Sequence, residues 1–290
     1  MRSITASFTL TTLAVLTALA TLAGAVLPQV ASAGPPFQTD DPVPVDLHHY
    51  EFYVFAGSDS TSGEIDPAGP AFEFNWGALP NTQIHVVLSF GAVLPSDGPS
   101  SYGLLDTELG VKYRLIGETK YLPEVGTFPM IEVPTGSYSR GLGVGKTHYK
   151  LPIWVQKDFG PWTTYGGGGY QIVPREGFRN FPYAGWLLQR DVGEKLTLGG
   201  ELWYHGPEGA ATPIDRSVTM FDFGGYYYFR KPAFQLLFTL GHTIAGQSET
   251  YAYLGLYWTW GPKEPAAADT AGPAWSFAAR PSAASGRRYE

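Results

Sequence analysis

The stretch Leu105-Asp-Thr-Glu-Leu-Gly-Val-Lys-Tyr-Arg-Leu115 decides the fold, because apolar and charged residues alternate along it. Leu105 and Leu109 share one parity, whereas Glu108 and Lys112 share the other. Successive side chains of a β-strand point to opposite faces of the sheet. The stretch is therefore a strand with one apolar face and one charged face. A soluble β-sandwich would bury the apolar face, and a transmembrane β-barrel would turn it toward lipid.

The composition of the 290-residue chain favours the barrel. Aromatic residues make up 15% of it and charged residues 16%, which is well below the usual quarter or so. Beyond the N-terminus there is no run of about 18 apolar residues, so no spanning helix is predicted. Cysteine is absent, which excludes zinc–thiolate sites and cysteine nucleophiles. The net charge of −7 argues against nucleic acid as a partner.

The N-terminus has the pattern of a secretory signal. Arg2 precedes the apolar run 8–27, and Ala31-Ser-Ala33 is a small-residue cleavage site, so residues 1–33 are predicted to be a signal peptide. A retained membrane anchor is the alternative. The expected units after it are a Pro-rich segment over 34–47, the barrel over 48–260 and a disordered tail over 261–290.

Strand-like segments recur along the predicted barrel, most of them long enough to cross a bilayer when tilted. They are residues 48–57, 70–78, 82–93, 103–115, 123–133, 146–157, 162–173, 181–190, 195–205, 217–229, 233–243 and 250–260. Tight turns at 79–81 and 158–161 alternate with longer connections such as 58–69 and 134–145. Short turns at one rim and long loops at the other are typical of outer-membrane barrels. We predict an all-β fold, a transmembrane antiparallel up-and-down β-barrel of about 12 strands.

Aromatic residues cluster near the ends of the predicted strands. Examples are Trp76, Trp154, Trp162, Trp203 and Trp260. We interpret them as girdles at the two membrane–water interfaces. The alternative is that they are core residues of a sandwich.

Polar residues recur on the inward-facing parity of these strands. The candidates for the lumen lining are Glu73, His85, Asp106, Glu108, Lys112, Arg114, Glu132, Glu201 and Asp222. Buried charges must be paired or hydrated, so we expect Lys112 and Arg114 to find acids on neighbouring strands, with Glu132, Glu201 and Asp222 as the obvious partners. One interpretation is a pore lining that sets selectivity, and the other is a structural network that fills the barrel. The sequence favours neither.

No motif predicts catalysis. None of the six histidines has a Ser two positions on, and Gly-x-Ser-x-Gly is absent. The glycine run 166–169 lacks the Lys-Ser/Thr of a phosphate loop and suits a closely packed barrel wall. We therefore expect no catalytic, cofactor-binding or metal residues. An outer-membrane lipid-modifying enzyme is the least favoured alternative.

Several motifs resemble one known family. They are Gly34-Pro-Pro-Phe-Gln-Thr-Asp-Asp-Pro-Val-Pro-Val-Asp46, Tyr50-Glu-Phe-Tyr53, Asp106-Thr-Glu-Leu-Gly-Val-Lys-Tyr-Arg114, Pro134-Thr-Gly136, Arg140-Gly-Leu-Gly143, Pro152-Ile-Trp-Val-Gln-Lys157, Trp162-Thr-Thr-Tyr-Gly-Gly-Gly-Gly-Tyr170 and Gly185-Trp-Leu-Leu-Gln-Arg190. Over residues 34–260 the chain resembles the outer-membrane barrel family named for the meta-pathway of phenol degradation, whose members are often labelled transporters. The resemblance implies an outer-membrane barrel associated with uptake of small aromatic or hydrophobic compounds. The tail 261–290 departs from the family pattern.

The sequence thus predicts a porin-like barrel in a bacterial outer membrane that passes or takes up small solutes. Its expected partners are outer-membrane lipid and an unidentified small molecule. A non-conducting structural or surface barrel is the main alternative. The solute and the oligomeric state stay open at this point.

Overall fold

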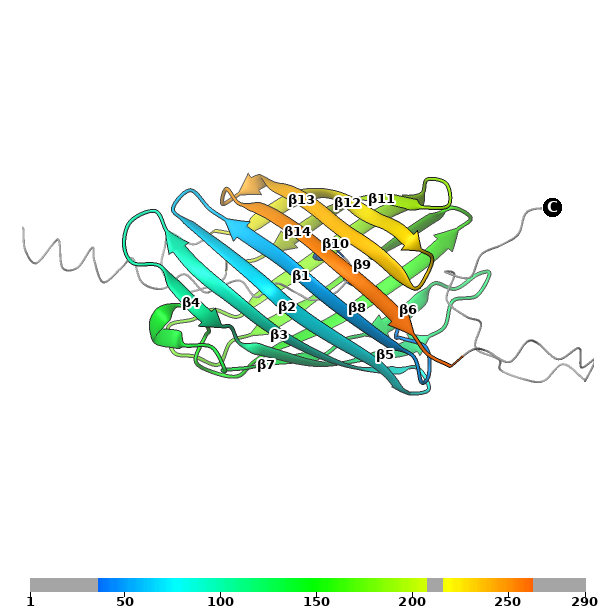
Figure 1. Ribbon diagram of the computed structural model, residues 1–290, viewed down its shortest axis with the longest axis horizontal. Helices are drawn as coiled ribbons and strands as arrows, with labels where there is room; N and C mark the ends of the chain where they lie inside the picture. Colours follow the sequence, from blue (N-terminus) through cyan, green and yellow to red (C-terminus); the bar gives the residue numbers. More distant parts are fainter. Residues whose placement is uncertain (1–35, 208–215, 263–290) are drawn as a thin grey trace, which may run out of the picture.

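The computed structural model describes residues 36–207 and 216–262 (Figure 1). The predicted signal peptide and all but the first two residues of the predicted tail lie outside these ranges. Among the described residues no helix is long and apolar enough to span a membrane.

The described chain is almost entirely β-structure. Its strands are β1 (Tyr50–Ser60), β2 (Glu64–Leu79), β3 (Thr82–Pro95), β4 (Ser101–Leu104), β5 (Thr107–Ile116), β6 (Glu124–Thr127), β7 (Met130–Val133), β8 (His148–Phe159), β9 (Trp162–Ile172), β10 (Phe181–Asp191), β11 (Leu196–His205), β12 (Val218–Arg230), β13 (Phe234–Gly246) and β14 (Thr250–Trp260). One 3₁₀ turn, η1 (Tyr138–Arg140), lies in the connection between β7 and β8.

The strands close into a barrel. Each pairs antiparallel with its neighbours, and β1 pairs with β14 from Tyr50 opposite Trp260 to Ser60 opposite Thr250. Both β4 and β5 pair with β3, and both β6 and β7 lie between β5 and β8, so each of these pairs is one interrupted strand. The result is a 12-strand barrel, as the sequence predicts. Closure leaves no sheet edge, so the backbone groups are satisfied without water.

Alternation along β5 sets the two faces of the wall. Leu109 and Val111 are exposed on the outside, whereas Glu108 and Lys112 are buried inside. The prediction for Leu105 is wrong, because this side chain is only 3% exposed. The wall is interrupted between β4 and β5, where the Leu105 N–H binds the Ser89 carbonyl 2.9 Å away. The interruption breaks the two-residue period and turns Leu105 into the interior.

Two other predictions are corrected. The stretch 58–69 is not a long loop, because β1 and β2 continue pairing beyond an irregularity at Phe55 and Gly57 as far as Ser60 and Ile65. The girdle prediction is also wrong for two of the five tryptophans given as examples. Trp76, Trp162 and Trp260 are exposed on the outer face. Trp154 is buried inside, and Trp203 packs against the same interior cluster, with its ring centroid 5.7 Å from that of Tyr183. Their parity points them inward, and parity decides the face.

Candidate functional site

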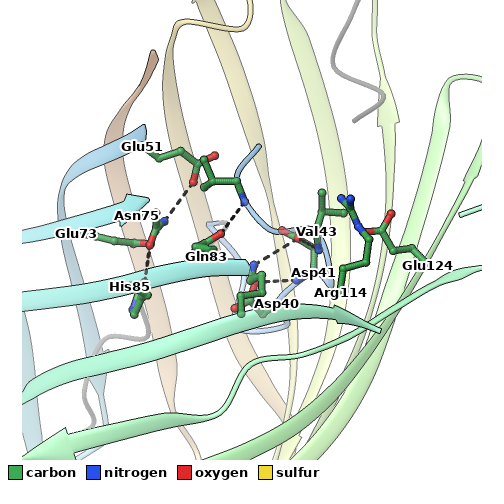
Figure 2. A network of polar contacts seen from close by, with 12 residues as sticks. Asp40, Asp41, Val43, Glu51, Glu73, Asn75, Gln83, His85, Arg114 and Glu124 are labelled. Carbon is green, nitrogen blue, oxygen red and sulfur yellow. Dashed lines mark hydrogen bonds and ion pairs between the residues drawn. The ribbon is translucent and has the colours of Figure 1, made fainter. Parts of the chain in front are cut away.

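The interior of the barrel is occupied by the chain that precedes the first strand. Residues 36–47, called the N-terminal segment below, have no regular structure, and Figure 2 shows Asp40, Asp41 and Val43 lying inside the barrel wall. Phe37 is 2% exposed and packs with Tyr165 and Leu187 of the wall. The sequence predicts an irregular Pro-rich segment here but gives no signal that it enters the barrel.

Glycines in the wall make room for the N-terminal segment. A Cβ at Gly185 on β10 would overlap the side chain of Thr39, which is completely buried. A Cβ at Gly126 on β6 would lie 2.7 Å from the Pro42 carbonyl oxygen. A larger residue at either position would force the segment away from the wall, because real Cβ atoms do not approach other atoms so closely.

Charged wall residues hold the middle of the segment. The Lys112 ammonium lies 2.9 Å from an Asp40 carboxylate oxygen and 3.4 Å from one of Asp41. The backbone N–H of Val45 donates to the side-chain oxygen of Gln83 on β3 at 2.9 Å. The sequence predicts a wall acid as the partner of Lys112, and this is wrong. The acids come from the N-terminal segment instead.

Two carboxylates hold the beginning of the segment. Glu201 on β11 is directly opposite Asp222 on β12, and both are completely buried. One Glu201 oxygen accepts the Gln38 N–H at 3.0 Å, and the other accepts the N–H of Thr39. The Gln38 amide donates to Asp222 at 3.3 Å. These acids bind peptide and amide groups, and neither neutralises Lys112 or Arg114.

Arg114 has a local partner. Its Nε donates to Glu124 on the adjacent β6 at 2.6 Å (Figure 2). Arg114 thus pairs with an acid on a neighbouring strand, as expected, but this acid is Glu124 and none of the three named ones. Glu124 occupies the inward parity of a four-residue strand, which is too short to show a clear alternation in the sequence.

A second polar network joins β2, β3, β5, β7 and β8. His85 Nδ1 lies 2.7 Å from the Asn75 amide oxygen and 3.4 Å from Glu73, and its Nε2 lies 3.1 Å from Glu108. Lys150 then bridges Glu108 and Glu132, at 2.9 and 3.0 Å.

His148 completes this network with a contact of 3.0 Å to Glu132. Lys150 and His148 are functional candidates that sequence reasoning missed. Both occupy the inward parity of β8, together with the buried Trp154. The alternation that identified the acids would have found these bases too.

Asp106 has a different role from the other lumen candidates. Its carboxylate accepts the N–H of Gly136 at 2.9 Å and that of Val144 at 2.8 Å, both from the connection 134–147. Leu142 and Val144 of this connection are buried. The long β7–β8 loop is therefore folded into the mouth of the barrel, with Asp106 as its anchor.

A buried apolar cluster lies next to that loop. It contains Leu105, Leu142, Val218, Met220 and Tyr251, together with Val87, Phe55 and Leu237. Val218 and Tyr251 lie at strand ends that carry the long loops, whereas Tyr257 of the same cluster lies near the short-turn rim. The buried His148 lies near the long-loop rim. Apolar and polar side chains therefore alternate along the depth of the lumen.

A small polar cavity lies in the interior. A cavity of about 60 Å³ lies between the N-terminal segment and the wall, lined by polar residues that include Asp40, Glu51, Glu73 and Asn75. This volume holds only a few water molecules. Glu201 and Asp222 are completely buried, so solvent does not reach these two side chains.

Comparison with solved structures places the fold. No family model and no curated protein matches the chain. The COG4313 outer membrane channel from Pseudomonas putida F1 is similar over 80% of this chain and 100% of its own, with a TM-score of 0.63 and 16% identity. Weaker likenesses are the KdgM porin in complex with disordered oligogalacturonate (TM-score 0.49, 8% identity, 71% of this chain and 98% of that one) and the NalP translocator domain from Neisseria meningitidis (0.49, 10%, 72% and 88%). The protein has the fold of an outer-membrane β-barrel.

Proposed function

We propose that this barrel passes small solutes across the outer membrane and that the N-terminal segment is the movable part that opens the path. One observation carries the proposal. The N-terminal segment is held in the lumen by side chains of the wall, through Lys112, Gln83 and Glu201, and it is not a strand of the sheet. It can therefore leave without breaking the barrel.

The interior of the barrel suits solutes with an apolar part. The buried apolar cluster includes Leu105, Met220 and Leu237, together with the inward aromatic rings of Phe55 and Tyr253, whose centroids are 5.2 Å apart. Apolar and aromatic surfaces gain free energy by leaving water in such a place. Small aromatic or hydrophobic compounds are thus the solute class that we propose.

The lumen candidates take their place in this proposal. Once the N-terminal segment leaves, Lys112 loses its carboxylate partners, and Glu201 and Asp222 lose their amide donors. These groups would then line a hydrated path and act on passing charges. The His85–Glu108–Lys150–Glu132 network stays intact, because all its members belong to the wall.

Displacing the N-terminal segment tests the proposal. A Cβ at Gly185 would overlap the Thr39 side chain, so Gly185→Ala should push the segment away from the wall. We expect higher conductance in planar bilayers and faster flux of small aromatic acids into liposomes than for the wild type, with boiled and unboiled samples still migrating differently. Gly63→Ala is the control, because a Cβ at Gly63 has no neighbour within 4 Å. Unchanged conductance and flux in Gly185→Ala would contradict the proposal.

The burial of charged side chains inside the barrel also favours a second candidate, a non-conducting structural barrel. The complete burial of Glu201 and Asp222 is the observation behind it. The two candidates differ in one result. A structural barrel shows neither conductance nor flux as the wild type, as Gly185→Ala, or after removal of residues 34–45.

A further inference from the structure

The connection between β5 and β6 differs from the other turns at its rim. Residues 117–123, Gly-Glu-Thr-Lys-Tyr-Leu-Pro, are called the rim loop below. Figure 1 shows this loop at the end of the barrel where β14 ends, which is also the end of the tight turns after β2 and β8. Short turns face the periplasm in outer-membrane barrels, so the rim loop lies at the level of the inner leaflet.

The rim loop is ordered by its own hydrogen bonds. The Thr119 N–H binds the Leu122 carbonyl at 3.0 Å, and the Thr119 hydroxyl accepts the N–H of Leu122 at the same distance. The loop therefore has a defined shape, with one side facing the wall and the other facing away from it.

Lys157 fixes the direction in which the rim loop lies. Lys157 lies on β8 directly opposite Thr164 of β9, so the two side chains are on the same face of the wall. The Thr164 hydroxyl accepts a hydrogen bond from the indole of Trp186, which is exposed on the outer face. Lys157 therefore also lies on the outer, lipid-facing side. Its ammonium binds Glu118 at 2.7 Å and the carbonyl oxygen of Thr119. The rim loop therefore lies against the outer face of the wall, where it covers the ammonium group of Lys157.

The side of the rim loop that faces away from the wall is apolar. Tyr121 is 83% exposed and Leu122 54%. Leu115 and Ile116 at the end of β5 are also exposed, and they continue the outer row of Leu109, Val111 and Tyr113. Lys120 lies over the Tyr121 ring, 5.4 Å from its centroid. Tyrosine beside lysine, at the edge of a lipid-facing row, is typical of the headgroup layer.

We propose that the rim loop is a membrane anchor that inserts Tyr121 and Leu122 into the headgroup layer of the inner leaflet, with Glu118 and Lys157 neutralising each other beneath them. The proposal rests on the outer-membrane location of the barrel. Its occupant is phospholipid rather than a protein, because the patch is continuous with the lipid-facing wall and the charge at its base is already paired.

A nitroxide probe tests this placement. Because the chain has no cysteine, Lys120→Cys gives one labelling site that keeps both anchor side chains. Leu109→Cys on the outer wall and the exposed Glu194→Cys in the turn between β10 and β11 are the lipid and water references. The barrel is reconstituted in phosphatidylethanolamine–phosphatidylglycerol vesicles, and collision with oxygen and with a nickel chelate is measured.

We compare the rate of collision with oxygen to the rate of collision with the nickel chelate for each label. The expected oxygen-to-nickel ratio at position 120 is several-fold above that at position 194 and below that at position 109. Adding Tyr121→Ser and Leu122→Ser should return it to the value at 194, while boiled and unboiled samples still migrate differently. If the label at position 120 gives the same ratio as the label at 194, while the label at 109 gives a high, lipid-like ratio, the anchor alone is overturned. If the label at 109 gives a low, water-like ratio, the membrane location is overturned and the anchor with it. Protection that appears only at high protein-to-lipid ratio shows contact with a second copy and also overturns the proposal.

Discussion

The ammonium of Lys112 lies 2.9 Å from the carboxylate of Asp40, and this contact joins the barrel wall to a segment 72 residues earlier in the chain. Both groups are buried. A buried charge that loses its partner is strongly unfavourable, so the contact couples the position of the N-terminal segment to the electrostatics of the wall.

Neutralising the acids of the segment should loosen it. Asp40→Asn with Asp41→Asn leaves Lys112 without a counter-charge, which costs about 3–5 kcal/mol for a buried pair and favours release of the segment. A cysteine at Val43 should then react faster with a water-soluble thiol reagent. Asp46→Asn is the control, because Asp46 is exposed. An unchanged rate would show that the segment is held without these charges.

Glu201→Gln should release the start of the segment. The carboxylate accepts two backbone N–H groups, whereas an amide offers one oxygen and turns its NH₂ toward the second N–H. The loss is about 1–3 kcal/mol for a buried donor left unsatisfied. We expect higher conductance in planar bilayers than for the wild type. The exposed Glu194→Gln should leave conductance unchanged, and equal traces for the two variants would contradict the assignment.

A charge on the outer wall should lower the free energy of unfolding more at the middle of the membrane than at the rim. Leu109→Arg places a charge where the sequence pattern puts the middle of the membrane, at about 2–4 kcal/mol, and Leu115→Arg near the rim at about 0–1 kcal/mol. Denaturant unfolding in lipid vesicles measures both. Equal costs would mean that the membrane does not cover β5 in this way.

Asp106→Ala should free the outer loop without unfolding the wall. It leaves the N–H groups of Gly136 and Val144 unpaired, at about 1–3 kcal/mol, and the loop escapes this cost by opening to water. Limited proteolysis should then cut within 134–147 faster, with an intact barrel core. Asp97→Ala, an exposed acid in the neighbouring loop, should not change cleavage. Resistance equal to wild type would indicate that Leu142 and Val144 hold the loop by packing alone.

The sequence alone determined the barrel, because the alternation of apolar and polar residues is local and has the two-residue period of a strand. All twelve predicted strands are present, and the inward parity of Glu108, Lys112 and Glu201 is that of buried side chains. The inward Lys150 and His148 could have been recognised in the same way. The alternating pattern shows on which face of the wall a side chain lies, but it does not show which residues that side chain contacts.

Only the tertiary structure decided which groups meet inside. Lys112 pairs with Asp40, Glu201 binds the backbone of the N-terminal segment, and Asp106 holds a loop. The N-terminal segment has no periodic pattern, so its place depends on contacts across the lumen rather than on neighbours in the chain. Strand stagger sets the height of each inward side chain, and an interruption such as that at Leu105 resets the parity. Both follow from how the strands pair around the whole barrel, which no single stretch of sequence records.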